Sequence, residues 1–131
     1  MMDACLSPSA YQSLEALSLL PSSSRPDGIL IGHQRGHRYF VEKALPLKKG
    51  LVSSPQYFDL DQLYEGRLIG FFSFRPDQKK IKKIMMPFAY GKLFLQVLIT
   101  SSSKMAIRSF MVDYKEKFFL SPIPLKGSGK K

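Results

Sequence analysis

The chain has 131 residues, which is enough for one domain with one hydrophobic core. Twenty lysine and arginine residues against ten acidic residues give a net charge of +10, which suits either an anionic partner or a soluble, charged surface; we favour the surface, because the charge is spread along the chain. No apolar run approaches the ~20 residues of a membrane span, the N-terminus lacks the basic cluster of a signal peptide, and a lone cysteine, Cys5, excludes an internal disulfide. We therefore expect a cytoplasmic protein without a membrane partner.

The first half of the chain alternates short apolar segments with turn-forming residues. Ser7-Pro8 marks a helix start, because serine caps a helix N-terminus and proline fits the first helical turn. Ala10, Leu14 and Leu17 then fall on one helical face. The elements expected here are a strand at 3–6, a helix from 8 to about 20, a strand at 29–31, a glycine-rich turn at 32–36 and a returning strand at 37–45.

The second half repeats the helix-start signal at Ser54-Pro55, and Gly66 can end the helix that follows. The elements expected here are that helix, a central strand at 68–74, a short lysine-rich helix from 76, a strand at 93–99 and hairpin strands at 105–112 and 117–120. This order predicts an α+β, or mixed α/β, fold with a single central sheet flanked by helices.

The segment Gly70-Phe71-Phe72-Ser73-Phe74-Arg75-Pro76 resembles a metalloprotease motif. Active members of the JAMM/MPN (Mov34) family read roughly Gly-aromatic-aromatic-His-Ser-His-Pro at this point. Gly28-Ile29-Leu30-Ile31-Gly32 is similar to the family's Gly-hydrophobic-Leu-hydrophobic-Gly strand, and Ala44-Leu45-Pro46 resembles its second hairpin strand. The resemblance covers nearly the whole chain. It implies one JAMM/MPN-like domain of cytidine-deaminase-like architecture at 1–125, followed by a flexible basic tail at 126–131.

The resemblance fails at the residues that carry the chemistry. Active family members bind zinc with two histidines and an aspartate, and a glutamate handles the proton of the metal-bound water. The positions that match the two histidines, the aspartate, the family serine and the glutamate are Ser73, Arg75, Met86, Lys83 and Arg25. A neutral hydroxyl is a poor zinc ligand, a guanidinium cannot ligate, and two cations repel a divalent ion. We therefore expect a degenerate site with no catalytic residue, metal or cofactor.

A fold that keeps its scaffold without its metal site implies a non-catalytic protein-binding or scaffolding module, a pseudoenzyme. Arg25, Arg75 and Ser73 suit an anion in the old cleft, such as a carboxylate terminus, while an internal pairing of Arg75 with Asp77 or Asp27 is the competing interpretation. Two alternatives stay open. One is a metal-dependent isopeptidase or hydrolase with unrecognised ligands, and the other is a basic domain that binds nucleic acid.

Other chemistry-bearing residues are interpreted as structural. His33 and His37 flank the glycine-rich turn without a nearby acid or cysteine, so we expect surface residues rather than a metal site. Cys5 is expected to be a small buried hydrophobe, and Asp59 and Asp61 to be solvated, since positions i and i+2 face different sides of a helix.

The sequence also contains one aromatic and one lysine-rich run. Phe71, Phe72 and Phe74 are expected in the core on both sheet faces, with Phe72 as the one ring that faces the old cleft. The lysines of 79–83 form either an electropositive face for an acidic partner or phosphate backbone, or the solvated side of a helix, which we favour.

Overall fold

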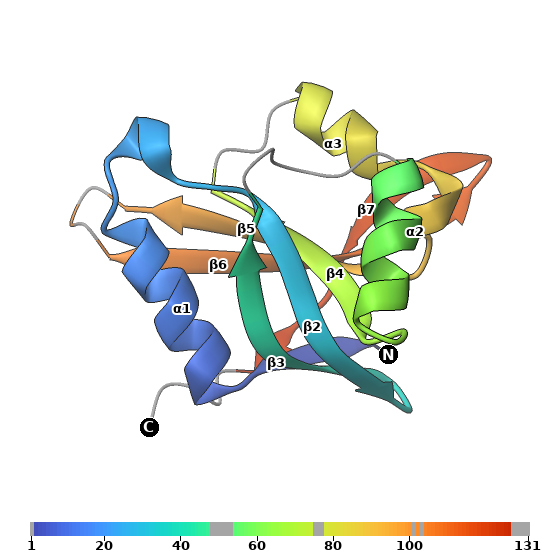
Figure 1. Ribbon diagram of the computed structural model, residues 1–131, viewed down its shortest axis with the longest axis horizontal. Helices are drawn as coiled ribbons and strands as arrows, with labels where there is room; N and C mark the ends of the chain where they lie inside the picture. The colour runs from blue at the N-terminus through green and yellow to red at the C-terminus, as the bar shows by residue number, and fades with distance from the viewer. Residues whose placement is uncertain (1, 48–53, 75–77, 101, 103, 127–131) are drawn as a thin grey trace.

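The computed structural model describes residues 2–47, 54–74, 78–100, 102 and 104–126. Within these residues, one mixed sheet has the strand order β7-β6-β5-β4-β2-β3-β1-β8 and is strongly curled into a half-barrel (Figure 1). The strands are β1 (Asp3–Leu6), β2 (Gly28–Arg35), β3 (Arg38–Pro46), β4 (Leu68–Ser73), β5 (Leu93–Ile99), β6 (Met105–Lys115), β7 (Lys117–Pro122) and β8 (Leu125–Lys126). The helices are α1 (Pro8–Ser18), α2 (Ser54–Leu63) and α3 (Gln78–Ile84), with 3-10 turns η1 (Ser22–Ser24) and η2 (Pro87–Ala89). The α+β prediction is confirmed.

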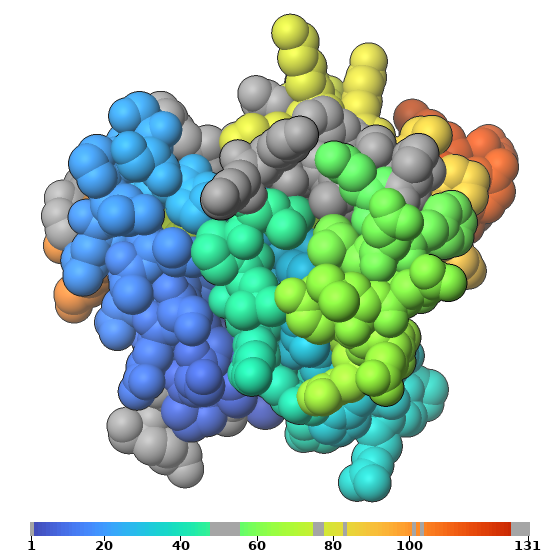
Figure 2. Space-filling view, viewed as in Figure 1, coloured from blue at the N-terminus to red at the C-terminus, as the bar shows by residue number. Residues whose placement is uncertain are grey.

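Helix α1 begins where the sequence predicts. The Ser7 hydroxyl accepts a hydrogen bond from the Ala10 backbone N–H at 3.0 Å and donates one to the Glu42 carbonyl at 2.8 Å, so the cap also ties the helix to β3. Ala10 and Leu14 are fully buried against the sheet. In the space-filling view of the same face, α1 and α2 lie on either side of β3 (Figure 2).

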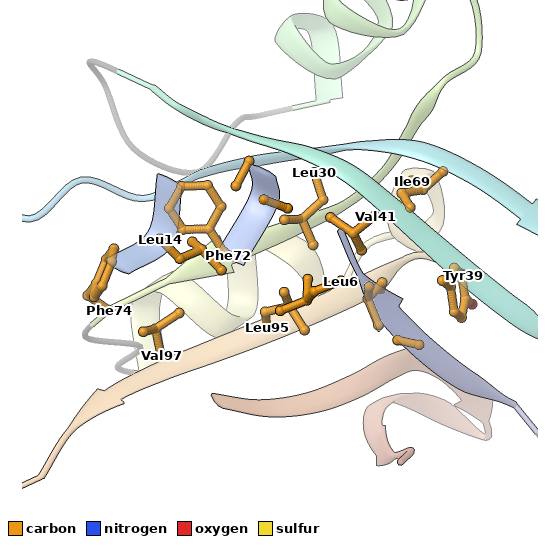
Figure 3. Close-up of a cluster of buried hydrophobic side chains, with 14 residues drawn as sticks. Leu6, Leu14, Leu30, Tyr39, Val41, Ile69, Phe72, Phe74, Leu95 and Val97 are labelled. Atoms are coloured by element: carbon orange, nitrogen blue, oxygen red, sulfur yellow. The ribbon is translucent and has the colours of Figure 1, made fainter. Parts of the chain in front are cut away.

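Two hydrophobic clusters cover the two faces of the sheet. The first packs α1 against side chains that include Phe72, Phe74 and Leu30, which point toward one another in Figure 3. The second gathers Phe71 and other strand residues with apolar side chains of α2, α3 and η2. The phenylalanines of β4 therefore serve both faces, as expected. The prediction that Phe72 faces a cleft is wrong, because strand alternation turns its ring toward α1, where it is fully buried.

Three of the described glycines, Gly28, Gly32 and Gly70, permit close strand pairing. A Cβ atom on Gly28 would lie 2.2 Å from the Leu45 carbonyl oxygen, and one on Gly70 would lie 2.2 Å from the Leu93 carbonyl oxygen. Neither backbone neighbour can rotate away as a side chain would. The motif glycine Gly70 is therefore required by the pairing of β4 with β5, whatever the chemistry nearby.

The structure differs from the expected elements at their ends. Strand β2 continues to Arg35 through the predicted turn, because the chain reverses only at Gly36, whose φ is +59°. A bulge between Ile31 and Gly32 re-registers the hairpin. Strand β6 runs to Lys115 rather than Val112, and the short β8 includes Lys126, the first residue of the expected tail. In the described part of the chain, no helix has the length and apolarity needed to cross a membrane.

Candidate functional site

Ser73 lies at the centre of a buried polar cluster. It ends β4, and Asp27 directly precedes β2, the neighbouring antiparallel strand, in which Gly28 is opposite Phe72. This register brings the two side chains together, and the Ser73 hydroxyl donates to Asp27 Oδ1 at 2.6 Å. Ser73 has no exposed surface, and Asp27 is 6% exposed.

Lys80 of α3 supplies the charge that balances Asp27. Its Nζ lies 3.3 Å from Asp27 Oδ1 and 3.2 Å from Oδ2, and its side chain is 31% exposed. Asp27, Ser73 and Lys80, hereafter the polar cluster, thus join the starts of β2 and α3 to the end of β4. The expectation of a wholly solvated lysine face is wrong for Lys80, because the helix turns it toward a buried carboxylate, while Lys79 and Lys82 are exposed as expected.

The other predicted site positions have separate surroundings. Arg25 Nε donates to the Leu20 carbonyl oxygen at 3.1 Å, which fastens Arg25 to the chain that follows α1. Met86 is 45% exposed immediately before η2. Arg75, with its suggested partner Asp77, lies outside the described residues, as does the side chain of Lys83. Among the described side chains, Ser73 is therefore the predicted position that the fold brings into the polar cluster.

The donor set of the polar cluster does not fit a zinc ion. Its one carboxylate already accepts from a hydroxyl and lies against an ammonium group, which carries no lone pair for a metal when protonated. Within residues 2–126, apart from the gaps given above, no group of three or more histidine, cysteine, aspartate or glutamate side chains could hold a metal ion. The sequence places Asp27 directly before Gly28, but which lysine pairs with Asp27 depends on where α3 lies.

A second charged group lies on the β2–β3 hairpin. His33 Nδ1 is 2.8 Å from Glu42 Oε2, the guanidinium of Arg67 donates to Glu42 Oε1, and the His33 ring stacks on Phe40 at a centroid distance of 5.0 Å. The hydrogen bond from His33 and then that from Arg67 lower the pKa of Glu42. The expectation that His33 lacks an acid partner is wrong, because the antiparallel pairing of β2 with β3 supplies one.

The remaining candidates agree with their expected surroundings in part. His33, His37 and Asp59 are exposed as expected. Cys5 is half-buried rather than buried, because alternation along β1 turns Ala4 and Leu6 to the buried face, and Asp61 is half-buried on α2 rather than fully solvated.

Comparison with known proteins identifies the fold alone. No protein-family model and no curated protein matches the sequence. The structure is similar to the solution structure of protein DSY2949 from Desulfitobacterium hafniense, a structural genomics target, with a TM-score of 0.63 over 95% of this chain and 93% of that chain. The two sequences are 18% identical over this match, so the likeness concerns architecture. The fold and the polar cluster together define a curled-sheet α+β domain with an internally paired carboxylate.

Proposed function

We propose that this chain is a non-catalytic JAMM/MPN-like domain that acts as a protein-binding or scaffolding module in the cytoplasm. The motif at Gly70–Pro76 and the agreement between expected and observed element order support the family assignment. The polar cluster supports the loss of catalysis, and it is the observation on which the proposal depends.

The polar cluster lacks what a hydrolytic site needs. A nucleophile or general base must reach the substrate, yet Ser73 is fully buried at the end of β4. Asp27 is held by the hydroxyl of Ser73 and the ammonium group of Lys80, so its oxygens are committed to internal partners. These contacts hold α3 against the sheet, so the role of the polar cluster is structural.

A second candidate function, nucleic-acid binding, is favoured by the charge around α3. From Gln78 to Lys92 the sequence has five lysines and no acidic residue. Side chains of α3 project from the molecular surface at the top of Figure 2. Such a surface attracts phosphate backbones and acidic proteins alike, and a binding assay with generic RNA or DNA separates the two.

Metal analysis and a hydrolysis assay test the proposal directly. After dialysis, the purified protein is expected to hold no stoichiometric zinc and to leave ubiquitin-like conjugates uncleaved. When expressed with a tag in its own host, it is expected to form a stoichiometric complex with a protein partner. Zinc that survives dialysis, or cleavage that a chelator abolishes, would establish the enzyme instead. Affinity for generic RNA or DNA that falls steeply with salt, without a protein partner, would establish the nucleic-acid function.

A further inference from the structure

An open apolar hollow lies beside the tip of the β6–β7 hairpin. It has a volume of about 350 Å³ and is lined by Pro87, Tyr90, Tyr114 and Phe118, which we call the aromatic hollow. Tyr114 and Phe118 are cross-strand neighbours, and their rings meet edge to face at a centroid distance of 4.8 Å. Tyr90 is 58% exposed and Tyr114 is 52% exposed. Exposed tyrosines that gather around an apolar depression are typical of a protein-binding surface.

The aromatic hollow adjoins an open edge of the sheet. Strand β7, which contributes Phe118, ends the strand order and pairs with β6 on one side, and among the described residues no strand pairs with its other side. Its outer backbone groups can therefore accept an added strand. An extended peptide that pairs with β7 gains main-chain hydrogen bonds, and it can place a side chain in a neighbouring pocket. The edge and the hollow are the two parts that this mode of recognition needs.

The charges around this surface favour an acidic ligand. Lys115 and Lys117 are exposed on either side of Glu116 at the hairpin tip. The other acid of the hairpin, Asp113, is half-buried and accepts a hydrogen bond from the Tyr114 backbone N–H. The segment that supplies Pro87 and Tyr90 lies within the stretch from Gln78 to Lys92, which has no acid. Lys80 of this stretch is paired with Asp27, while Lys79 and Lys82 are exposed. A second copy of the chain would bring the same positive charge, which opposes self-association.

The geometry of the aromatic hollow also favours a peptide over a nucleic acid as its ligand. Base stacking needs flat, accessible ring faces, whereas the Tyr114 and Phe118 rings are inclined at 63° to each other. A concave hollow with inclined rings suits one apolar side chain better than a row of bases.

We propose that β7 and the aromatic hollow bind an extended acidic peptide segment that carries one apolar anchor side chain. This inference rests on the proposed protein-binding function and names its surface and its ligand class. The peptide adds to the outer edge of β7, its anchor fills the aromatic hollow, and its carboxylates lie near Lys115 and Lys117.

A random-peptide display library tests the surface and needs no identified partner. The library is selected on the full chain, and enriched peptides are measured against wild type, the double variant Tyr90→Ser/Tyr114→Ser and the control Leu19→Ser. Leu19 is 83% exposed directly after α1, and Figure 1 shows α1 at the left of the molecule, away from the β6–β7 hairpin tip at the right. Enriched peptides are expected to combine acidic residues with an apolar anchor, to bind the double variant at least tenfold more weakly, and to bind Leu19→Ser as they bind wild type.

Amide hydrogen exchange with the enriched peptide then tests strand addition. Protection of β7 amides on binding is the expected result, and protection confined to other elements would overturn the proposal. Enriched peptides that bind the double variant as tightly as wild type would also overturn it, while leaving the proposed function standing. A selection that enriches no peptide, with oligonucleotides bound instead, would overturn both.

Discussion

Replacement of Lys80 by methionine tests whether the polar cluster is the internal ion pair that the structure shows. The substitution keeps the apolar stem and removes the cation, so Asp27 stays nearly buried without its opposite charge. Truncating one partner of a fully buried pair costs about 3–5 kcal/mol, whereas an exposed pair is worth about 0.2–1 kcal/mol. Asp27 is 6% exposed but Lys80 keeps 31% of its side-chain surface, so we expect a loss of about 1–3 kcal/mol.

Urea unfolding measures this loss. With a slope of about 1–3 kcal/mol per M, the midpoint is expected to fall by about 1 M. Lys79→Met is the matched control, since Lys79 is exposed on the same helix, and it is expected to leave stability within about 0.5 kcal/mol of wild type. The double variant Asp27→Asn/Lys80→Met removes the unpaired charge and is expected to recover part of the loss. The reasoning is refuted if Lys80→Met is as stable as Lys79→Met, or if the second substitution recovers nothing.

Three further predictions concern single side chains. The pKa of Glu42, lowered chiefly by its hydrogen bond with His33, is expected below 4.5 in an NMR titration. The stabilisation that ionised Glu42 provides is therefore fully present above pH 4.5 and is lost as the pH falls through the lower folded-state pKa. Glu42→Gln should flatten this part of the curve of stability against pH. Gly70→Ala is expected to cost about 1–3 kcal/mol or more in urea unfolding, because the added Cβ would meet the Leu93 carbonyl oxygen; wild-type stability would contradict the close pairing of β4 with β5. Burial raises the pKa of Tyr39 to about 12, so a phenolate absorbance titration should show one late transition that Tyr39→Phe removes.

Hydrophobic pattern predicted those elements whose residues are buried. Strand β5 occupies Leu93–Ile99 as expected, because a short apolar run bounded by polar residues is typical of a buried strand. The second half of β2 was missed, since its residues from His33 to Arg35 are exposed on both strand faces and leave no alternation to detect. Strand β8 has two residues and follows a proline, so its pairing with β1 depends on tertiary contacts that no local pattern encodes.

The candidate site was predictable in part. The motif singled out Ser73, and the structure places this residue in the polar cluster. Its hydrogen-bond partner Asp27 lies 46 residues earlier, and Lys80, which pairs with Asp27, lies seven residues after Ser73. Only the packing of α3 on the sheet decides which lysine reaches the carboxylate. The one signal in the sequence was an acid immediately before a buried strand, since a carboxylate there needs a partner once it is desolvated.

Under the proposed family assignment, the polar cluster gives the missing zinc ligands a physical interpretation. A zinc site needs several donors that converge on an open position, and such donors are costly to hold together without the ion. In this chain the carboxylate meets one hydroxyl and one ammonium group, so its charge is balanced by a cation that belongs to the polypeptide. Lys80 ties α3 to Asp27 at the start of β2, and Asp27 in turn holds Ser73 at the end of β4. The proposed scaffolding function requires a domain that keeps its shape, and this internal ion pair fits that requirement.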